Sequence, residues 1–388
     1  MPQSPFFELQ IEEDMTKFTM DDGRQSPARI MVIGVGGAGG NAINWMVQSQ
    51  ITGVELVAAN TDIQALRTSL ASIKLQIGAK VTGGLGCGGI PELGRQAALE
   101  DTERIIELLD GVDMVFITGG MGAGTCTGAA PVFASLATEL EVLTVAVVTK
   151  PFDFLGSKRR RYAEEGIREL GNVVDAIITV SNERLLHALE ESALLEESLR
   201  YAADVLFQAV QGISDIITVP GIWNADFADV RTAMAGKGTA FMGSGIAEGP
   251  NRAVEAAQRA LSSPLLDEMS IKGPAAVLIN ITGSRSTLKL HETRVATNII
   301  EEAMRPEDVI LGAVYDDSMA DRIKITIIAT GFSREELEGS DRSEAEGSRP
   351  PGCNPEPPAT ELRNAIDVPR QFAKGDLEAP AFWRRRAV

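Results

Sequence analysis

The sequence predicts an α/β fold: a mainly parallel sheet covered by helices on both faces, followed by a smaller α+β domain. Short apolar runs alternate with stretches of helical period over the first half of the chain, which is the pattern of βαβ units with buried strands. These runs lie at residues 30–33, 54–58, 114–117, 142–148 and 176–180. Ligands of such sheets bind at the carboxyl ends of the strands, so the loops after these runs are expected to form the site.

A long helix and a second group of strands follow. From about residue 191 to residue 216, apolar side chains recur every three or four positions, which predicts a helix that connects two domains. Beyond it, apolar runs surround a helical stretch near residues 291–304; these runs lie at residues 275–282, 309–314 and 323–330. The chain has 388 residues, of which 44% are hydrophobic, and this is enough for two domains with separate cores.

Polar segments flank these domains. Residues 1–28 are polar and aperiodic, and residues 333–375 are charged and rich in Pro, Gly and Ser, so both are predicted to be disordered. Residues 376–388 combine Leu, Phe and Trp with three arginines, which indicates a docking peptide or, alternatively, a merely sticky tail. The predicted order is an arm at 1–28, a first domain at 29–190, a central helix and connection at 191–223, a second domain at 224–332, a linker at 333–375 and the peptide at 376–388.

Charge and cysteine content narrow the function classes. Thirty-six basic and fifty-four acidic side chains give a net charge of -18, so binding of nucleic acid and direct membrane insertion are not expected. The three cysteines lack the paired spacing of zinc sites or disulfide frameworks, and no metal-binding cluster is predicted. No apolar stretch reaches membrane-spanning length, and the start lacks the basic and apolar regions of a signal peptide. We expect a cytoplasmic protein.

The first glycine-rich segment, IMVIGVGGAGGNAINWMV, lies between a predicted strand and a predicted helix. Glycine lets the backbone approach a phosphate closely, and a helix N-terminus adds free N–H groups and a favourable dipole. Gly34, Gly36 and Gly39 also satisfy the GxGxxG pattern of Rossmann dehydrogenases, and Asp62 follows at about the distance expected of a ribose contact. This segment alone leaves a nicotinamide dinucleotide and another nucleotide equally open.

Two further segments favour a nucleotide with several adjacent phosphates. FITGGMGAGTCTGAAPV follows another apolar run and leads into a helix, and TGGLGCGGIPELG adds Gly83, Gly84, Gly86, Gly88 and Gly89. A dinucleotide-binding fold needs one such loop, whereas several converging loops suit a chain of phosphates. The alternative interpretation is that all three are only tight turns. GxxxxGK[ST] does not occur in the sequence, which argues against a P-loop enzyme.

The order of these motifs resembles FtsZ, the bacterial relative of tubulin, from Arg29 to the C-terminus. The matching segments are GVGGAGGNA, AANTD, GLGCGGIPELG, GAGTCTGAAPV, TKPFDF, NADFADVRTAM and APAFWRR. The resemblance implies a tubulin/FtsZ-like fold, with a Rossmann-like GTPase domain, a central helix and a smaller α+β C-terminal domain. It also implies GTP or GDP as the ligand, Mg²⁺ bound through the phosphates, and head-to-tail filaments in which each subunit completes the active site of the next.

The resemblance assigns nucleotide-binding roles to particular residues. Those on the phosphate loops are Gly37, Ala38, Gly39, Gly40, Asn41, Gly124, Thr125 and Cys126, with Asn41 also near the guanine. Arg159 falls near the ribose and phosphates, and Asp204 falls on the base contact in the central helix. From the residues alone, Arg159 in SKRRRY also fits a solvated surface, whereas Asp204 on an otherwise apolar helix requires a partner.

Five positions depart from the family pattern. Ala123 and Cys126 stand where the signature loop GGGTGTG has glycine, so their β-carbons are expected to obstruct the approach of the backbone or to penalise a positive φ. The other departures are Leu155 for a glutamate at the ribose, Ala203 for an asparagine and Leu199 for an aromatic near the base. Each lost hydrogen bond costs about 0.5 to 1.5 kcal/mol, so affinity and base selectivity are expected to change. A redox-sensitive Cys126 is disfavoured, because adjacent phosphate would raise the pKa of its thiol.

A polar constellation follows the central helix in PGIWNADFADVRTAM. Asp226 and Asp229 are three residues apart, so both carboxylates can project on one side of a helical first turn, with Asp226 near the N-cap. By itself this is a good helix start. The resemblance implies that Asn224, Asp226 and Asp229 are catalytic and orient the water that attacks the GTP of the neighbouring subunit. A heterologous contact of this kind does not close and generates filaments.

The resemblance therefore predicts a GTPase that forms the scaffold of the division ring at mid-cell. Residues 376–388, with APAFWRR, resemble the family's docking peptide for membrane-bound or regulatory division proteins. One alternative is a weakly or non-hydrolysing paralogue that acts as a structural co-polymer, which the altered signature loop and Leu155 favour. A Rossmann oxidoreductase is the other, and only the first loop favours it. Because all three catalytic positions are polar, a slow enzyme is favoured over an inactive one.

Overall fold

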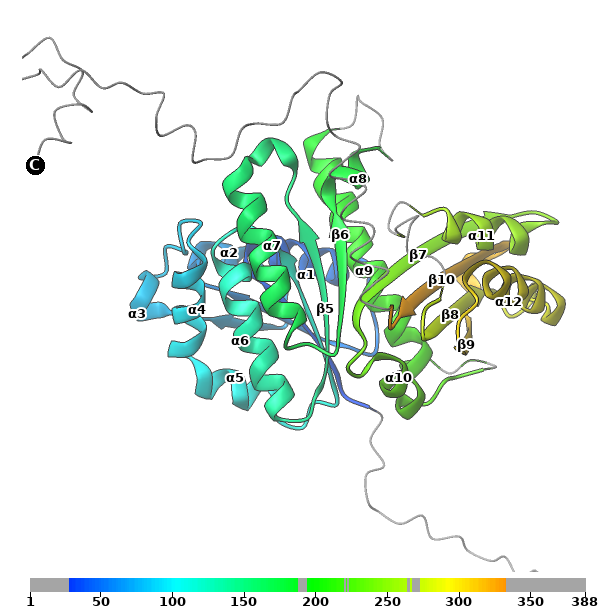
Figure 1. Cartoon of the computed structure of the whole chain (residues 1–388), viewed down its shortest axis with the longest axis horizontal. Coiled ribbons are helices and arrows are strands. Elements are labelled where there is room, and N and C mark those ends of the chain that lie inside the picture. Colours follow the sequence, from blue (N-terminus) through cyan, green and yellow to red (C-terminus); the bar gives the residue numbers. More distant parts are fainter. Residues whose placement is uncertain are drawn as a thin grey trace, which may run out of the picture. The chain divides into compact units, whose positions relative to one another are not determined.

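The computed structural model describes residues 28–187, 194–219, 221, 223–263, 266 and 273–332 (Figure 1). Apart from residue 28, the predicted N-terminal arm lies outside the described residues. The predicted linker and docking peptide also lie outside them.

Six parallel strands form the first part of a ten-stranded sheet, in the order β3-β2-β1-β4-β5-β6. They are β1 (Ile30–Val35), β2 (Glu55–Asn60), β3 (Ile73–Gln76), β4 (Met114–Gly120), β5 (Leu143–Lys150) and β6 (Ala176–Ser181). This is the strand order of a Rossmann fold, in which the order reverses between β1 and β4. The first two glycine-rich loops leave the sheet at this switch point, where such folds bind their ligands.

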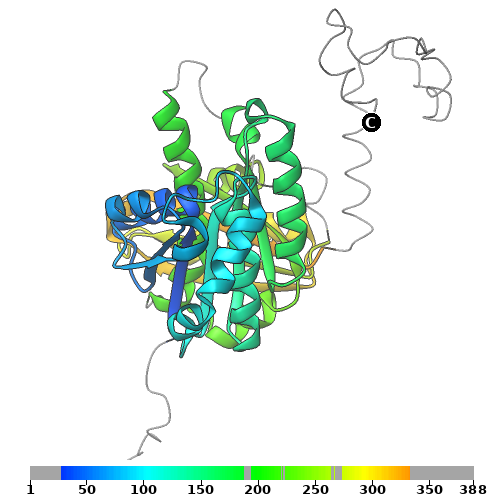
Figure 2. The same cartoon turned by 90° about the vertical axis from the view of Figure 1, so that its left-hand side faces the viewer.

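Helices cover both faces of the parallel strands (Figure 2). One face carries α1 (Gly36–Gln48), α2 (Ile63–Thr68), α8 (Asn182–His187) and α9 (Leu195–Thr218), and α10 (Phe227–Met234) packs in the same apolar cluster. The other carries α4 (Pro91–Glu100), α5 (Thr102–Leu109), α6 (Thr125–Glu139) and α7 (Ser157–Gly171). Alternate residues of a strand point to opposite faces, so Val32 packs in the first cluster and Ile33 in the second. Both faces are therefore apolar, which explains the continuous apolar runs.

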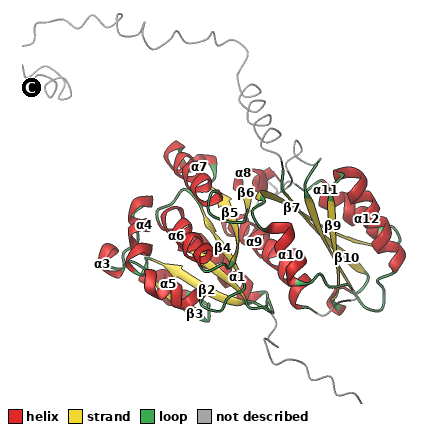
Figure 3. Ribbon diagram, turned by 60° about the horizontal axis from the view of Figure 1, so that its bottom comes forward, coloured by secondary structure: helices red, strands yellow, loops and turns green. Residues whose placement is uncertain are grey.

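The sheet continues from the parallel strands into a mainly antiparallel part through a short seam. β7 (Gly238–Glu248) pairs in parallel with β6 over three residue pairs only, and then antiparallel with β10 (Arg322–Thr330) over nine. β8 (Ala276–Gly283) and β9 (Asp308–Tyr315) complete the sheet. The helices α11 (Arg252–Leu261) and α12 (Leu290–Met304) cover one face of these strands (Figure 3). The other face packs on α9, which thus contacts both parts of the sheet.

Every strand predicted from an apolar run is present, and the predicted connecting helix is α9. The sequence did not predict β3 and β7. β3 has four residues, two of them polar, and β7 contains glycines where α11 crosses it closely. A β-carbon on Gly243 would lie 2.1 Å from Ala260 O, and one on Gly245 would lie 2.2 Å from Ala256 O. Because α11 packs so closely, these positions of β7 must be glycine. The strand therefore lacks the β-branched side chains from which a strand is usually predicted.

Three short elements complete the described chain: α3 (Ala79–Thr82), η1 (Asp153–Leu155) and η2 (Asp317–Met319). Within the described ranges, none of the helices combines the length and the apolar composition needed to cross a bilayer.

Candidate functional site

Two helix N-termini come together at the switch point of the sheet. α1 begins directly after β1, and α6 begins in the loop after β4; neither has a side-chain cap or an acidic residue in its first turn. Gly36 has a φ of +74°, and a β-carbon there would lie 3.3 Å from Thr125 Cβ and 3.4 Å from Cys126 N. The free N–H groups and positive dipole ends of two helices are therefore adjacent, an arrangement that binds anions such as phosphate.

Hydroxyl and thiol groups connect the other loops to this point. Thr61 Oγ1 and Thr125 Oγ1 lie 2.8 Å apart and share a hydrogen bond. Cys87 Sγ lies 3.4 Å from Thr61 Oγ1 and 3.5 Å from Thr125 Oγ1. These residues belong to AANTD, GLGCGGIPELG and GAGTCTGAAPV, which are far apart in the sequence. The predicted convergence of the glycine-rich loops is therefore confirmed.

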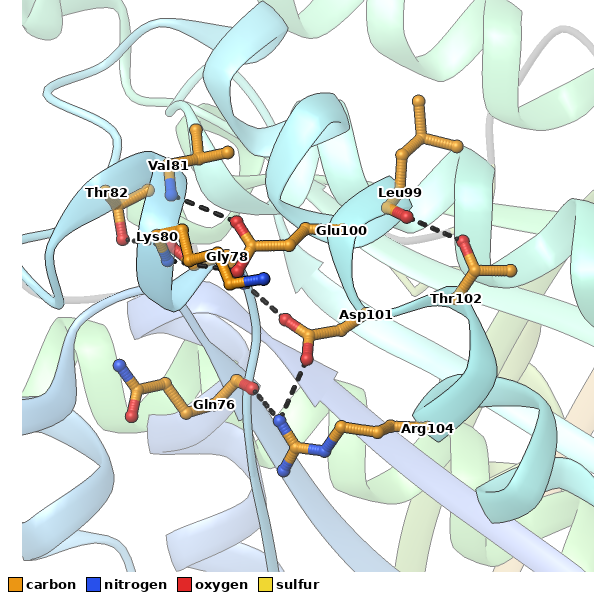
Figure 4. Close-up of polar contacts among 10 residues, drawn as sticks. All are labelled: Gln76, Gly78, Lys80, Val81, Thr82, Leu99, Glu100, Asp101, Thr102 and Arg104. Atoms are coloured by element: carbon orange, nitrogen blue, oxygen red, sulfur yellow. Dashed lines mark hydrogen bonds and ion pairs between the residues drawn. The ribbon is translucent and has the colours of Figure 1, made fainter.

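Carboxylates anchor the start of the third loop (Figure 4). Glu100 accepts hydrogen bonds from the backbone N–H groups of Lys80 and Val81, both at 3.0 Å. Asp101 accepts one from Gly78 N–H at 2.7 Å and one from Arg104 at 3.0 Å. These N–H groups begin α3, whose N-cap glycine has no side chain, so the two carboxylates replace a capping residue. The glycines that follow α3 all have a positive φ; they are Gly83, Gly84, Gly86, Gly88 and Gly89.

The two substitutions in the signature loop do not strain the backbone. Neither Ala123 nor Cys126 has a positive φ, so the expected conformational penalty is wrong. Cys126 is buried in the cluster between α6 and the sheet, and its Sγ lies 3.7 Å from Met121 Sδ. Its side chain therefore points into the core rather than toward a phosphate. Burial raises the pKa of this thiol to about 12, which disfavours the reactive thiolate.

A pocket lies between α1 and α9. Asn41, Trp45 and Gln48 of α1 and Leu199, Arg200 and Ala203 of α9 line a volume of about 520 Å³. Beside it, Trp45 Nε1 donates to Asp204 Oδ1 at 3.1 Å, and Gln208 Nε2 donates to Asp204 Oδ2 at 2.6 Å. The Arg200 guanidinium lies 5.0 Å from the ring centroid of Trp45. Asp204 thus has the partners that its position on an apolar helix requires.

Arg159 lies in the first turn of α7, next to the second loop. A β-carbon on Gly122 would lie 2.5 Å from Arg159 O, so the loop and α7 are in contact. The Arg159 side chain is exposed and has no partner among the described residues, whereas Arg160 pairs with Asp153 at 3.3 Å. A cation in the first turn opposes the helix dipole. An exposed and unpaired Arg159 is compatible with both interpretations, an anion-binding side chain and a solvated one.

The three predicted catalytic residues lie around the start of α10. Asp226 is the N-cap of this helix, as predicted, and its Oδ1 accepts from Asp229 N–H at 2.8 Å. Asn224 closes the preceding turn, since it accepts from Gly221 N–H at 2.6 Å and donates to Val219 O at 2.8 Å. The carboxylate of Asp229 is exposed and makes no bond to any described residue. Of the three polar side chains, that of Asp229 is the one without a hydrogen bond to the described residues.

α10 is attached to the amino ends of the parallel strands. Arg231 donates to Glu141 O at 2.7 Å, just before β5, and Gly236 N–H donates to Asp175 Oδ1 at 3.2 Å, just before β6. The glycine-rich loops lie at the carboxyl ends of these strands. β5 has eight residues, so the two edges lie about 23 Å apart along the strand. Within one chain, Asp226 and Asp229 cannot reach a ligand bound at the loops.

Sequence reasoning did not identify Trp45, Gln208 or Cys87 as parts of the site. Trp45 lies four residues after Asn41 and three before Gln48, so helical spacing alone puts all three on one face of α1. In the same way, Gln208 lies four residues after Asp204 on α9. Cys87 sits among glycines, and its sequence position gives no signal of its contacts.

The architecture is that of a tubulin-like GTPase, with two glycine-rich loops at the switch point, a third beside them, and a long helix that packs on both parts of the sheet. The family model for the GTPase domain of the Tubulin/FtsZ family matches residues 29–190, and the model for the C-terminal domain of the FtsZ family matches residues 238–333. The cell division protein FtsZ of Pseudomonas aeruginosa is 52% identical over 316 residues, which cover 81% of this chain and 80% of that protein. The chain belongs to the FtsZ family.

Other relatives agree with this assignment. The cell division protein FtsZ of Coxiella burnetii is 50% identical over 312 residues, covering 80% of this chain and 81% of that protein. A solved FtsZ dimer from M. jannaschii superposes with a TM-score of 0.75 at 39% identity, over 79% of this chain and 89% of that one. CetZ2 from Haloferax volcanii, at 21% identity and a TM-score of 0.68 over 83% of this chain and all of that one, shares the fold.

Family membership confirms the predicted fold class, the GTPase activity and the role as a cell-division protein. A GTPase domain of this family binds guanine nucleotide. The alternative of a Rossmann oxidoreductase is therefore wrong, although the strand order that suggested it is present.

Proposed function

We propose that this chain forms head-to-tail filaments and hydrolyses GTP at each contact between subunits. The separation of the two edges carries this proposal: the phosphate-binding loops lie at the carboxyl ends of the strands, and Asp226 and Asp229 lie at the amino ends. Repeating the chain along the strand direction brings the carboxylates of one subunit to the loops of the next. The two surfaces differ, so the contact is heterologous and continues as a filament.

GTP and GDP fit the loops at the carboxyl edge. The phosphates would lie at the joined N-termini of α1 and α6, against the backbone N–H groups of Gly37, Ala38, Gly39 and Gly40 on one side and Gly124, Thr125 and Cys126 on the other. Arg159 supplies positive charge that no described carboxylate neutralises. The base would enter the pocket between α1 and α9, which Asn41 lines and beside which Asp204 offers its carboxylate.

Mg²⁺ fits this site as an ion held mainly by the nucleotide. Among the described residues, no group of three or more His, Cys, Asp or Glu side chains is arranged to hold a metal. The loops instead offer backbone N–H groups and the hydroxyls of Thr61 and Thr125. Mg²⁺ commonly keeps several waters and takes its other ligands from phosphate oxygens. When bound there, it neutralises charge on the phosphates.

The polar residues at the amino edge would position the attacking water. Asp229 has a free carboxylate that can accept a hydrogen bond from this water, while Asp226 already uses one oxygen to cap α10. Asn224 fixes the turn that presents them. Hydrolysis then needs little covalent chemistry from the protein, because positioning and charge stabilisation carry phosphoryl transfer to water. The products are GDP and phosphate.

The filament would act as the scaffold of the division ring, in the cytoplasm at mid-cell. The sequence of residues 376–388 supports docking of membrane-bound or regulatory division proteins, since it joins aromatic anchors to three arginines. The second candidate is a structural co-polymer that hydrolyses GTP weakly. Leu155 favours it, because an exposed apolar side chain replaces a hydrogen-bonding glutamate near the ribose.

A mixing experiment tests hydrolysis between subunits. Gly37→Glu disables the loops, because a side chain there meets no atom within 4 Å but brings negative charge to the phosphates. Gly37→Gln is the uncharged control. Asp226→Asn with Asp229→Asn disables the amino edge and keeps a capping residue. Each disabled protein alone is expected to release no phosphate from GTP.

An equal mixture of the two disabled proteins is expected to recover about a quarter of the wild-type rate, since that share of random contacts joins an intact loop to intact carboxylates. Sedimentation verifies that both proteins enter the filaments. Joint sedimentation without recovery would contradict catalysis between subunits. Wild-type filaments that release no phosphate would instead establish the structural co-polymer.

A further inference from the structure

We infer that Trp45 is a positioning residue for base selectivity: its indole N–H, held in place by Arg200, fixes the Asp204 carboxylate so that it can receive both donors of a guanine. The inference rests on the proposed function in one respect, the contact between Asp204 and the base. It goes further by assigning roles to Trp45 and Arg200.

The hydrogen bonds of Asp204 occupy only part of the acceptor capacity of its carboxylate. Trp45 Nε1 donates to Oδ1 at 3.1 Å, and Gln208 Nε2 donates to Oδ2 at 2.6 Å. Each carboxylate oxygen has two lone pairs, so one acceptor site remains on each. Guanine presents two adjacent donors, N1–H and the N2 amino group, that match two such acceptors side by side. The two protein donors thus satisfy Asp204 without excluding a guanine.

Trp45 sets the orientation of this carboxylate relative to the phosphates. Gln208 lies one helical turn from Asp204 on the same helix, so it cannot fix Asp204 with respect to another element. Trp45 comes from α1, the helix whose N-terminus forms the first phosphate loop. The bond from Trp45 to Asp204 therefore relates the base contact to the phosphate contact.

The indole ring is itself restrained. The Arg200 guanidinium lies 5.0 Å from its centroid, a cation–π contact that favours one ring orientation. The flanking Met46 is fully buried and holds this turn of α1 in the core. A rigid ring gives a fixed N–H direction and hence a fixed plane for the carboxylate.

Loss of this restraint has a specific consequence. A fixed carboxylate gains from both guanine donors, whereas a carboxylate that rotates gains less from the second. Hypoxanthine, the base of ITP, has the N1–H of guanine but lacks its N2 amino group. Loss of the Trp45 hydrogen bond should therefore reduce the preference for GTP over ITP more than it reduces the affinity for the triphosphate group that both ligands share.

The test measures the dissociation constants of GTP and ITP for the full chain, by competition with a fluorescent GTP analogue. All proteins carry Asp226→Asn with Asp229→Asn, so that hydrolysis does not consume the ligands. Trp45→Phe keeps an aromatic ring and removes the N–H, and Trp45→His keeps a ring N–H. Trp45→Phe is expected to lower the ratio of the ITP Kd to the GTP Kd about three- to tenfold, which is the typical net contribution of one hydrogen bond. Trp45→His is expected to retain more of the ratio.

Arg200→Met tests the restraint on the ring and keeps much of the side-chain stem. The Arg200 side chain is exposed, so this variant should fold. If the Trp45 variants fail to fold, Arg200→Met alone tests the inference. It is expected to lower the ratio in the same direction. An unchanged ratio in Trp45→Phe and Arg200→Met, or an equal loss in Trp45→Phe and Trp45→His, would overturn the inference. A parent protein that does not prefer GTP over ITP would overturn the proposed base contact itself.

Discussion

The sulfur of Cys126 occupies the space that a side chain on Gly119 would need. A β-carbon on Gly119 would lie 2.5 Å from Cys126 Sγ and 2.7 Å from Val35 O. The glycine at the end of β4 and the cysteine in α6 are therefore one packing unit. The side chain of Cys126 is accommodated within the core, in the space beside Gly119, and the backbone of the signature loop is not strained.

This relationship predicts a coupled pair of substitutions. Gly119→Ala should destabilise the fold by about 1 to 3 kcal/mol, because the added methyl group overpacks the core. Cys126→Gly should relieve the contact with sulfur but not the contact with Val35 O. In a double-mutant cycle by urea denaturation, the two changes together should therefore cost at least about 0.5 kcal/mol less than the sum of the single costs. Additive costs would show that the two residues do not share space.

Burial of Cys126 predicts low thiol reactivity. With a pKa of about 12, its thiolate fraction at pH 8 is about a thousandfold below that of a free cysteine. We expect alkylation by iodoacetamide, followed by mass spectrometry, to leave Cys126 unmodified in the native protein and to modify it rapidly in urea. Addition of GTP should not change this. Alkylation at equal rates in both states would mean that the thiol is accessible.

The ion pair between Arg252 and Glu292 predicts a dependence of stability on pH. Arg252 is 6% exposed and donates two hydrogen bonds to Glu292, at 2.7 and 2.9 Å, and these bonds lower the pKa of the glutamate. A lowered carboxyl pKa stabilises the fold above the unfolded value and loses this contribution as pH falls through the folded value. Glu292→Gln should therefore cost about 3 kcal/mol at pH 7 and progressively less below about pH 4.5.

Glu255→Gln is the matched control for this pair. Glu255 pairs with Arg259 at 3.3 Å, but both side chains are largely exposed. Such surface pairs contribute about 0 to 1 kcal/mol. Thermal denaturation across a pH series should separate the two variants at neutral pH and bring them together in acid. Equal costs at pH 7 would contradict a special role for the buried pair.

The anchoring of the third loop predicts a local effect of Glu100. Glu100→Gln removes the charge from the group that accepts from Lys80 and Val81, and hydrogen bonds to charged groups contribute about 1.5 to 3 kcal/mol. We expect the amides of Lys80 and Val81 to exchange their hydrogens roughly tenfold faster or more, while global stability changes little. Glu103→Gln, on the exposed side of α5, should leave these amides unchanged. Slower or unaltered exchange in Glu100→Gln would show that the charge does not hold α3.

Sequence patterns predicted those features that depend on local chemistry. Apolar runs located the strands because both faces of the sheet are buried, and the N-cap role of Asp226 followed from its spacing to Asp229. The glycine-rich loops were found because phosphate binding requires glycine at fixed places. These signals come from residues close together in the chain.

Features that depend on contacts between distant segments were not predicted. Trp45 and Asp204 are 159 positions apart, and only the packing of α1 on α9 brings them together. The direction of the Cys126 side chain follows from the start of α6, so the expected strain could not be judged from the motif. The separation of the carboxylates from the loops required the strand order and the place of α10 at the amino edge.

The short seam between β6 and β7 has a mechanical consequence. Load that passes along a filament must cross from the parallel strands to the antiparallel ones, where the sheet is joined by three residue pairs against nine between β7 and β10. The continuous helix α9 spans this joint on one face. The backbone pairing across the seam is therefore short, and the packing of α9 against both parts of the sheet adds a second connection between them.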